Sequence, residues 1–357
     1  MRETIAAFRG AGLRVIMLTG DQRLTAVSVG RALGLLQNDE QALEGREIDL
    51  LDDETLAHRM AAAGVASRIS PEAKLRVVQA LQRRGECVAM LGDGINDAAA
   101  LRQADIGVAM GRGSDLAKEA ADVILLDDRF ATVGAAVEQG RVIFDNIRHF
   151  VYYLFSCNLA EVLVFFGAAL ARFGPLLLPL QILWLNLVTD TFPALALAVE
   201  PGEPDVMRRP PRDPRAGMLP GGLTILTLAD AALIALLALS AYSLGLSAGG
   251  PALATTMAFN TLAVAQLFHL GNARSRDSVL GWQRVVANPA ALAAVFGVLA
   301  LQILVTEWAP LAGVLNLVPL GVSGWALVLA LGGVTGLAGQ LRRLVVGRRR
   351  EGLAAAR

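Results

Sequence analysis

Two carboxylates in one short loop are the clearest chemical signal in this sequence. Asp93 and Asp97 stand four residues apart in the segment LGDGINDAAAL, residues 91–101. The apolar run Cys87–Leu91 predicts a buried strand, and Asn96 marks the expected start of a helix. Carboxylates at the end of a parallel strand, beside a helix N-terminus and glycines that permit close approach, are typical of a site for Mg²⁺ and phosphate.

Two further segments could complete a phosphate site. Thr19-Gly20-Asp21 follows the apolar run 14–18, and Lys74 lies in the first turn of a helix that the Ser-Pro pair at 70–71 predicts. A hydroxyl and backbone N–H groups can hold phosphoryl oxygens, a lysine can neutralise them, and Mg²⁺ offsets the charge of the transferred group. Each Gly-Asp segment alone is an ordinary turn sequence. Together, and in this order, they favour the phosphate site.

A second set of polar residues lies within long apolar segments. Asn158 and Glu161 are three residues apart and therefore share a helix face. Asn186, Thr189 and Asp190 share a face of the next helix, where a following proline frees backbone carbonyls. These oxygens suit a hard cation, and ionisable groups in a bilayer usually mark an ion path. The alternative is structural hydrogen bonding between helices.

The elements that must position these residues fall into two halves. Of the 357 residues, 54% are hydrophobic, and the mean hydropathy of +0.51 is too high for an ordinary soluble protein. Short apolar runs alternate with helical patterns before residue 130, which predicts an α/β domain with a parallel sheet. A long helix is expected over 131–149. Six runs of membrane-spanning length follow, at 150–170, 173–199, 222–246, 251–270, 289–306 and 319–341.

The charged residues between these runs predict how the chain crosses the membrane. Basic residues gather in alternate loops and in the tail 342–357, at Arg208, Arg209, Arg212, Arg215, Arg274, Arg276, Arg284, Arg342, Arg343 and Arg348–Arg350. The positive-inside rule then places these loops and both termini in the cytoplasm. Asp230, near the start of its run, is interpreted as structural or interfacial. Cys87 and Cys157 lie in apolar sequence and do not indicate a disulfide framework.

The motifs resemble those of P-type cation-transporting ATPases, of the calcium-pump-like branch. The likeness covers the chain from about Ile5 to its end, and its most specific parts are the GDGIND loop at 92–97 and the NLVTD stretch at 186–190. Where that family has a proline in the GDGxNDAPAL motif, this chain has Ala99. The other matching segments are Thr25-Ala26, Ala104–Gly111, Asp145–Arg148, Asn158–Glu161, Leu183–Asp190 and Arg208–Pro211.

The resemblance implies a partial haloacid-dehalogenase-like phosphorylation domain over 1–130, a stalk helix over 131–149 and a cation-transporting membrane domain over 150–341. By motif, Asp93 would hold Mg²⁺ with support from Asn96 and Asp97. Thr19, Gly20 and Asp21 would line the phosphate pocket, where Lys74 would stabilise the phosphate. The implied ligands of the transported cation are Asn158, Glu161, Asn186, Thr189, Asp190 and Gln266.

The family's phosphorylated aspartate lies in a DKTGT motif that this sequence does not contain. The ATP-binding domain, the actuator domain and four membrane helices also have no counterpart here. We therefore expect this chain alone to be inactive, as a fragment or as one half of a split pump whose other half is a separate chain. A membrane phosphatase of the same fold would need an aspartate ahead of Thr19, and residues 1–18 have none. A non-catalytic regulator is the third reading.

Ca²⁺ is the favoured cargo, in a multi-pass protein of a bacterial plasma membrane with lipid and cation, and no nucleic acid, as partners. In calcium pumps with two sites, the eighth helix adds a glutamate where this chain has Gln266. The neutral amide favours one Ca²⁺ per cycle, or Mn²⁺, and a monovalent ion stays open. A heavy-metal pump is disfavoured, because that branch has a shorter membrane part and sulfur ligands.

Overall fold

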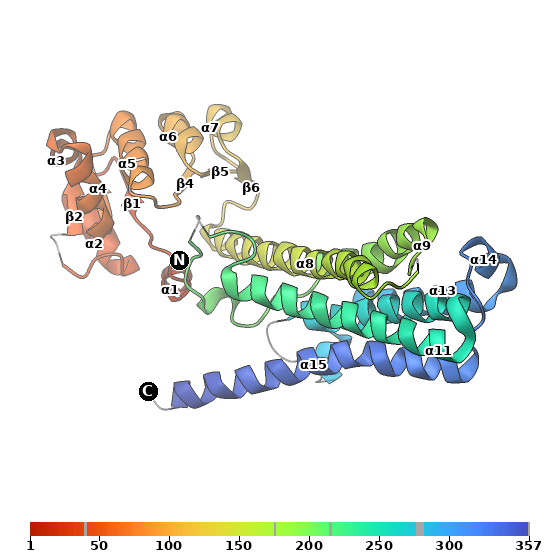
Figure 1. Cartoon of the computed structure of the whole chain (residues 1–357). Helices are drawn as coiled ribbons and strands as arrows, with labels where there is room; N and C mark the ends of the chain where they lie inside the picture. Colours follow the sequence, from red (N-terminus) through yellow and green to blue (C-terminus); the bar gives the residue numbers. More distant parts are fainter. Residues whose placement is uncertain (39–40, 175, 214–215, 276–281, 356–357) are drawn as a thin grey trace. The chain divides into compact units, whose positions relative to one another are not determined.

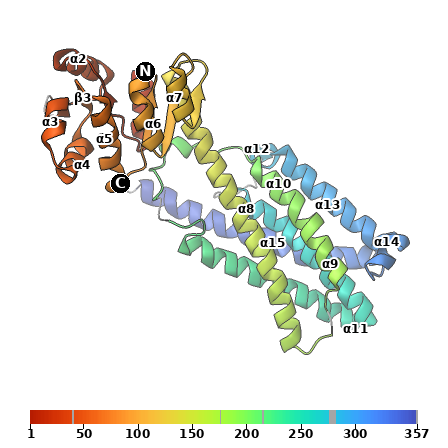
Figure 2. The same cartoon turned by 90° about the horizontal axis from the view of Figure 1, so that it is seen from above.

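The computed structural model describes residues 1–38, 41–174, 176–213, 216–275 and 282–355. The chain forms two compact units, which Figures 1 and 2 show in two views. The first unit comprises Met1–Arg141 and Pro204–Arg215, and the second comprises Val142–Glu203 and Ala216–Arg357. Arg215 and Arg276, which were assigned to basic loops, lie outside the described residues.

The first unit contains two parallel sheets where a single sheet was expected. One has the strand order β1-β3-β2 and the other has the order β4-β5-β6. The single-sheet prediction was wrong because none of the described strands pairs with both β1 and β4, which are edge strands. The bounds are β1 Met17–Leu18, β2 Ala42–Glu44, β3 Val65–Ser67, β4 Ala89–Gly92, β5 Ile106–Met110 and β6 Val123–Leu125.

Helix α5, Pro71–Arg83, packs against both sheets. Its N-terminus forms as expected: the Ser70 hydroxyl accepts a hydrogen bond from the N–H of Ala73 at 3.1 Å, with Pro71 in the first turn. Leu18 in β1 and Val88 just before β4 each contact the two apolar clusters to which α5 contributes. The other helices of this unit are α1 Arg2–Gly10, α2 Arg23–Leu33, α3 Gly45–Leu50, α4 Asp53–Ala62, the 3₁₀ turn η2 Ile95–Asp97, α6 Ala98–Gln103, α7 Asp115–Ala120 and the 3₁₀ turn η4 Val206–Arg208.

Polar contacts within the first unit join one helix to another and a helix to a loop. Asp53, at the start of α4, accepts hydrogen bonds from Arg83 and Arg76 of α5, and these bonds lower the pKa of its carboxyl group. Arg141 donates to the carbonyl oxygens of Val206 and Arg209 at 2.9 Å. The loop between the second and third predicted spans is therefore part of the first unit.

The second unit is built from helices long and apolar enough to cross a membrane. Five such helices occur among the described residues. They match six predicted segments because α11, Gly221–Ala273, contains the third and fourth, separated where Gly249 and Gly250 leave helical geometry. Gly250 has φ +81°, a conformation that favours glycine.

The expected long helix, α8, is continuous from the first unit into the second. It extends over Phe130–Leu170 without a break. The remaining elements of the second unit are α9 Pro179–Trp184, the π-helical turn η3 Leu185–Asp190, α10 Thr191–Ala198, α12 Trp282–Val286, α13 Pro289–Glu307, α14 Ala309–Val314 and α15 Gly321–Ala355.

Candidate functional site

The loop after β4 is organised around the buried carboxylate of Asp97. One oxygen of Asp97 accepts a hydrogen bond from the Lys74 ammonium at 2.6 Å. The other accepts from the backbone N–H groups of Asp93 and Gly94 at 3.3 and 3.2 Å. A Cβ atom on Gly92 would lie 2.6 Å from Cβ of Asp97, so only glycine fits there. Asp97 therefore fixes the loop and orients Lys74.

Asp93 and Asn96 present their side chains outward from this fixed loop. Both side chains are exposed, whereas Asp97 is buried. The backbone of Asp93 is held by a hydrogen bond from the N–H of Ser114 to its carbonyl oxygen at 2.8 Å. No three Asp, Glu, His or Cys side chains in the described part of the chain could hold a metal by themselves. The Asp93 carboxylate with the Asn96 amide oxygen fits Mg²⁺, which takes one or two carboxylates together with water and phosphate oxygens.

Thr19-Gly20-Asp21 forms a tight turn after β1. The Thr19 hydroxyl accepts from the N–H of Asp21 and donates to its carboxylate, both at 3.1 Å. The Thr19 carbonyl accepts from the N–H of Ile69 at 3.2 Å, which ties this turn to the start of α5. The structure thus joins Lys74, Asp93 and Asp97 directly and connects the Thr19 turn to them through the backbone leading into α5.

The predicted cation ligands of the second unit form one polar cluster between α8, η3 and α11. Glu161 accepts from the amide of Asn186 at 3.4 Å and from the amide of Gln266 at 3.1 Å. The Asn158 amide lies 3.5 Å from the carboxylate of Asp190. Glu161, Asp190 and Gln266 are all buried. The structure therefore brings together side chains that are 105 residues apart in sequence, as the Glu161–Gln266 contact shows.

Several oxygens of this cluster are buried without a partner. Among the described residues, no hydrogen bond reaches Oγ1 of Thr189, Oδ1 of Asp190 or Oε1 of Gln266. A buried acceptor left without a partner costs about 1–3 kcal/mol. A bound cation would satisfy this arrangement, in which one unpartnered oxygen belongs to the Asp190 carboxylate and the other two are neutral oxygens of Thr189 and Gln266.

The backbone at this cluster departs from an α-helix. Residues Leu185–Asp190 form a π-helical turn, a feature common at functional sites. Pro193 has no N–H to donate to the carbonyl of Thr189, and that carbonyl accepts instead from the Tyr153 hydroxyl at 3.2 Å. The sequence predicted the freed carbonyls through this proline, but it did not predict the π-helical turn.

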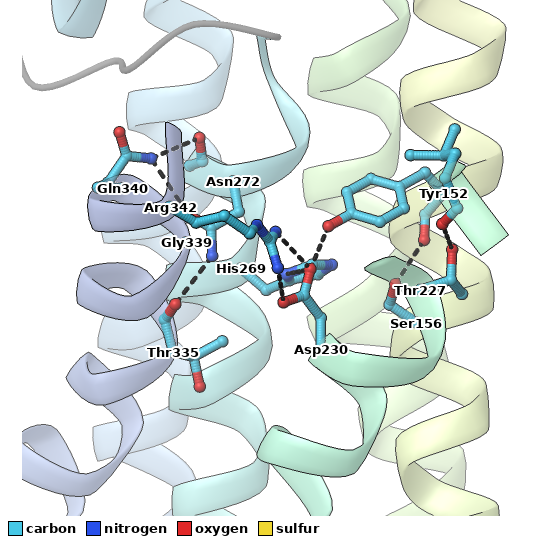
Figure 3. Close-up of polar contacts among 12 residues, drawn as sticks. Tyr152, Ser156, Thr227, Asp230, His269, Asn272, Thr335, Gly339, Gln340 and Arg342 are labelled. Carbon is cyan, nitrogen blue, oxygen red and sulfur yellow. Dashed lines mark hydrogen bonds and ion pairs between the residues drawn. The ribbon is translucent and has the colours of Figure 1, made fainter. Parts of the chain in front are cut away.

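A second buried cluster surrounds Asp230, which the sequence did not single out as a site. Both carboxylate oxygens of Asp230 accept from the guanidinium of Arg342, at 3.0 and 3.1 Å, and the Tyr152 hydroxyl also donates to it (Figure 3). The ring of His269 lies 5.2 Å from that of Tyr152, centroid to centroid. These partners come from α8, both halves of α11 and α15. The cluster holds four membrane helices together. This supports a structural role for Asp230 and identifies the side chains that contact it.

We expect Asp230→Asn to lower the free energy of unfolding by about 3 kcal/mol, because it leaves the Arg342 guanidinium without its countercharge. Thermal unfolding of the purified chain in detergent measures this loss. Asp115→Asn is the matched control, since the Asp115 side chain is fully exposed. Equal unfolding temperatures for the two variants would show that the Asp230 cluster does not stabilise the unit.

The two cysteines differ in their surroundings. Cys157 is buried, but Cys87 is exposed, which corrects the expectation of apolar surroundings for both. Cys87 lies just before β4 and outside the apolar clusters.

Known proteins resemble both halves of the chain. Residues 174–345 match the family described as cation transporting ATPase, C-terminus, and residues 1–105 match haloacid dehalogenase-like hydrolases. A calcium-transporting ATPase of Bacillus subtilis (strain 168) is 39% identical over 94% of this chain and 38% of its own length. The chain is similar to the C-terminal portion of P-type cation-transporting ATPases along nearly its whole length.

Two other relatives are also named as ATPases that transport a cation or calcium. A probable cation-transporting ATPase F of Mycobacterium tuberculosis (strain H37Rv) is 40% identical over 92% of this chain and 37% of its own length. An endoplasmic reticulum calcium ATPase of Aspergillus fumigatus is 47% identical over 59% of this chain and 22% of its own length. The chain thus spans less than two fifths of each of these relatives. Its apolar helices and these transporter relatives make it a multi-pass membrane protein.

Proposed function

We propose that this chain is the cation-binding and phosphate-binding part of an ATP-driven cation pump that works through an aspartyl phosphate. The observation that carries the proposal is the buried cluster of Glu161 and Asp190, where oxygens of Thr189, Asp190 and Gln266 have no hydrogen-bond partner in the described part of the chain. Two carboxylates buried in a membrane unit are costly unless they bind a cation. Asn158, Asn186 and Gln266 contribute the neutral ligands.

A divalent cation fits this site best, and Ca²⁺ is the proposed cargo. Two carboxylates would neutralise one divalent ion, and the calcium-transporting relatives carry that ion in their names. Asn158 is exposed within a membrane-spanning helix, beside Asp190. An amide in that position would face further protein in preference to lipid. This supports completion of the site by helices outside this chain.

On the first unit, we assign Asp93 and Asn96 to Mg²⁺, and Thr19, Gly20, Asp21 and Lys74 to the phosphate group. When bound, Mg²⁺ would offset the negative charge of the phosphoryl group. Asp97 keeps the Lys74 ammonium at the loop through their 2.6 Å contact. ATP is the proposed phosphoryl donor, bound outside this chain.

The division of the strands into two sheets supports a proposal for where the phosphorylated aspartate, which this sequence does not contain, would lie. β1 and β4 are edge strands that both contact α5, and each ends at a proposed phosphate-binding loop. A parallel strand added between them would end beside Thr19 and Asp93, because parallel strands present their carboxyl ends at one edge. We propose that this strand carries the phosphorylated aspartate, in the same polypeptide or in a partner chain.

The basic loops support a proposal for the orientation of the chain in the membrane. Arginines follow the second, fourth and sixth predicted spans, so we place these loops and both termini in the cytoplasm, with the pump in a bacterial plasma membrane. The first unit would then meet ATP and Mg²⁺ on the cytoplasmic side.

Vesicle uptake tests the proposal. The chain is co-expressed with, or fused to, the N-terminal part of the Bacillus subtilis relative, and ATP-dependent ⁴⁵Ca²⁺ uptake into inverted vesicles is measured. Uptake above that of either part alone supports the pump. If no cation is taken up although phosphoenzyme forms, the reading as a phosphatase or regulator is favoured instead.

A further inference from the structure

A buried amide joins α8 to the end of α10. The side-chain amide of Asn146, on α8, donates to the carbonyl oxygens of Ala198 at 3.2 Å and of Glu200 at 2.8 Å. Asn146 is 6% exposed, so these hydrogen bonds are shielded from water. Ala198 is the last residue of α10, and the final carbonyls of a helix have no partner within that helix. Asn146 therefore caps the end of α10 from a different helix.

The contact of Asn146 belongs to an antiparallel register between α8 and the segment that follows it in space. One helical turn before Asn146, the side chain of Val142 packs closely against the backbone of Gly202, where it leaves no room for a Cβ atom. Further along α8, the Tyr153 hydroxyl donates to the carbonyl of Thr189 at 3.2 Å. Residue numbers thus rise on α8 while those of the partners fall. Because the second unit begins at Val142, Asn146 makes its contact near the point where α8 enters that unit.

Other contacts hold the same end of α10 to the rest of the second unit. The carboxylate of Glu200 accepts from the guanidinium of Arg274 at 3.0 Å and from the amide of Asn288 at 2.6 Å. Asn288, the N-cap residue of α13, also donates to the carbonyl of Ala196 at 2.8 Å. Two buried amides therefore donate to the end of α10 from different helices. The contact of Asn146 joins this end to α8, whereas that of Asn288 joins it to α13.

The two helices that Asn146 joins carry the two buried carboxylates of the proposed cation site. Glu161 lies on α8, and Asp190 directly precedes α10. α8 is also continuous with the first unit, which contains the proposed phosphate site. Rigid helices and the hydrogen bonds between them can carry a displacement from one site to another. We propose that Asn146 is a positioning residue that makes α8 and α10 move together, so that both carboxylates respond to phosphorylation. This inference rests on the proposed pump function.

The amount of Ca²⁺ transported per ATP tests this coupling. The chain is fused to the N-terminal part of the Bacillus subtilis relative, and ⁴⁵Ca²⁺ uptake and ATP hydrolysis are measured on the same vesicles. Asn146→Leu removes the amide donor at similar volume, so phosphorylation would displace α8 without α10. We expect the Ca²⁺ taken up per ATP hydrolysed to fall by about fivefold or more, the size of a typical coupling between sites. Phosphoenzyme should still form at saturating Ca²⁺, because the residues of both proposed sites are unchanged.

Asn288→Leu is the matched control, because it removes an amide donor to the same end of α10 from α13 and not from α8. It should leave the ratio of uptake to hydrolysis at the value of the parent. Asn146→Ala should lower the ratio as Asn146→Leu does, and it replaces the leucine variant if that variant does not fold. Unfolded protein contributes to neither uptake nor hydrolysis, so a purely structural loss would lower both quantities and leave their ratio unchanged.

The outcomes separate the role of Asn146 from the pump function on which it rests. A ratio that stays unchanged in the Asn146 variants overturns the coupling role and leaves the pump function standing. A ratio that falls equally in Asn288→Leu also overturns it, because the end of α10 would then need support from either side. If the parent fusion forms phosphoenzyme but takes up no cation, the pump function and this inference are both wrong.

Discussion

Asp190→Asn is expected to weaken cation activation of ATP hydrolysis by about 100-fold or more in the fused pump. The substitution removes one of the two buried carboxylates, and a loss of about 3 kcal/mol of charge interaction corresponds to that factor. The measurement is the Ca²⁺ concentration giving half-maximal ATPase activity. Volume and shape change little, so the effect reports on charge.

Asp230→Asn provides the matched comparison for that experiment. It is the same substitution at another buried aspartate of the same unit, where Arg342 and not a cation is the partner. It should lower thermal stability while leaving the Ca²⁺ requirement within about twofold. If both variants shift the Ca²⁺ requirement equally, Asp190 has no special role.

Asp93→Asn is expected to lower Mg²⁺-dependent phosphoenzyme formation by about 100-fold or more, because metal stabilisation of phosphoryl charge contributes several kcal/mol. The Asp93 side chain is exposed, so the variant should keep its unfolding temperature. Acid-stable incorporation of ³²P from labelled ATP measures the effect. Asp115→Asn, on the exposed start of α7, is the control. Normal phosphorylation of the Asp93 variant would show that Asp93 does not bind the Mg²⁺ needed for the reaction.

The sequence predicted the fold where patterns were local. Ser70 and Pro71 predicted the start of α5, and a stretch with no breakers except Gly134 and Gly140 predicted the continuous helix α8. The parallel sheet could not be predicted as two sheets, because the pairing of β1 and β4 depends on strands distant in sequence. Likewise the two long runs within α11 were visible, but the geometry at Gly249 and Gly250 depends on how their ends pack.

The candidate sites divide in the same way. Asp93, Asp97, Glu161 and Asp190 were identified by type and spacing, and Lys74 was found to contact Asp97 as expected for one pocket.

The partners of Asp230 could not be predicted from the spacing of residues in the sequence. Its partners Tyr152 and Arg342 are 78 and 112 residues away, so only the folded chain reveals them. Asp190 and Asp230 are each a single acid in an apolar run, but only Asp190 has polar companions at helical spacing, Asn186 and Thr189. The structure adds a second difference, because Asp230 has a guanidinium as its partner, whereas Oδ1 of Asp190 has no hydrogen-bond partner among the described residues.

Two variants of the fused pump can be compared in two assays, ATP-dependent ⁴⁵Ca²⁺ uptake and Mg²⁺-dependent phosphorylation by inorganic phosphate without Ca²⁺. Asp190→Asn should abolish uptake but retain phosphorylation by phosphate, because the phosphate pocket is intact. Asp93→Asn should abolish both. Uptake that survives Asp190→Asn, or phosphorylation that survives Asp93→Asn, would contradict the assignment of cation and phosphate sites to this chain.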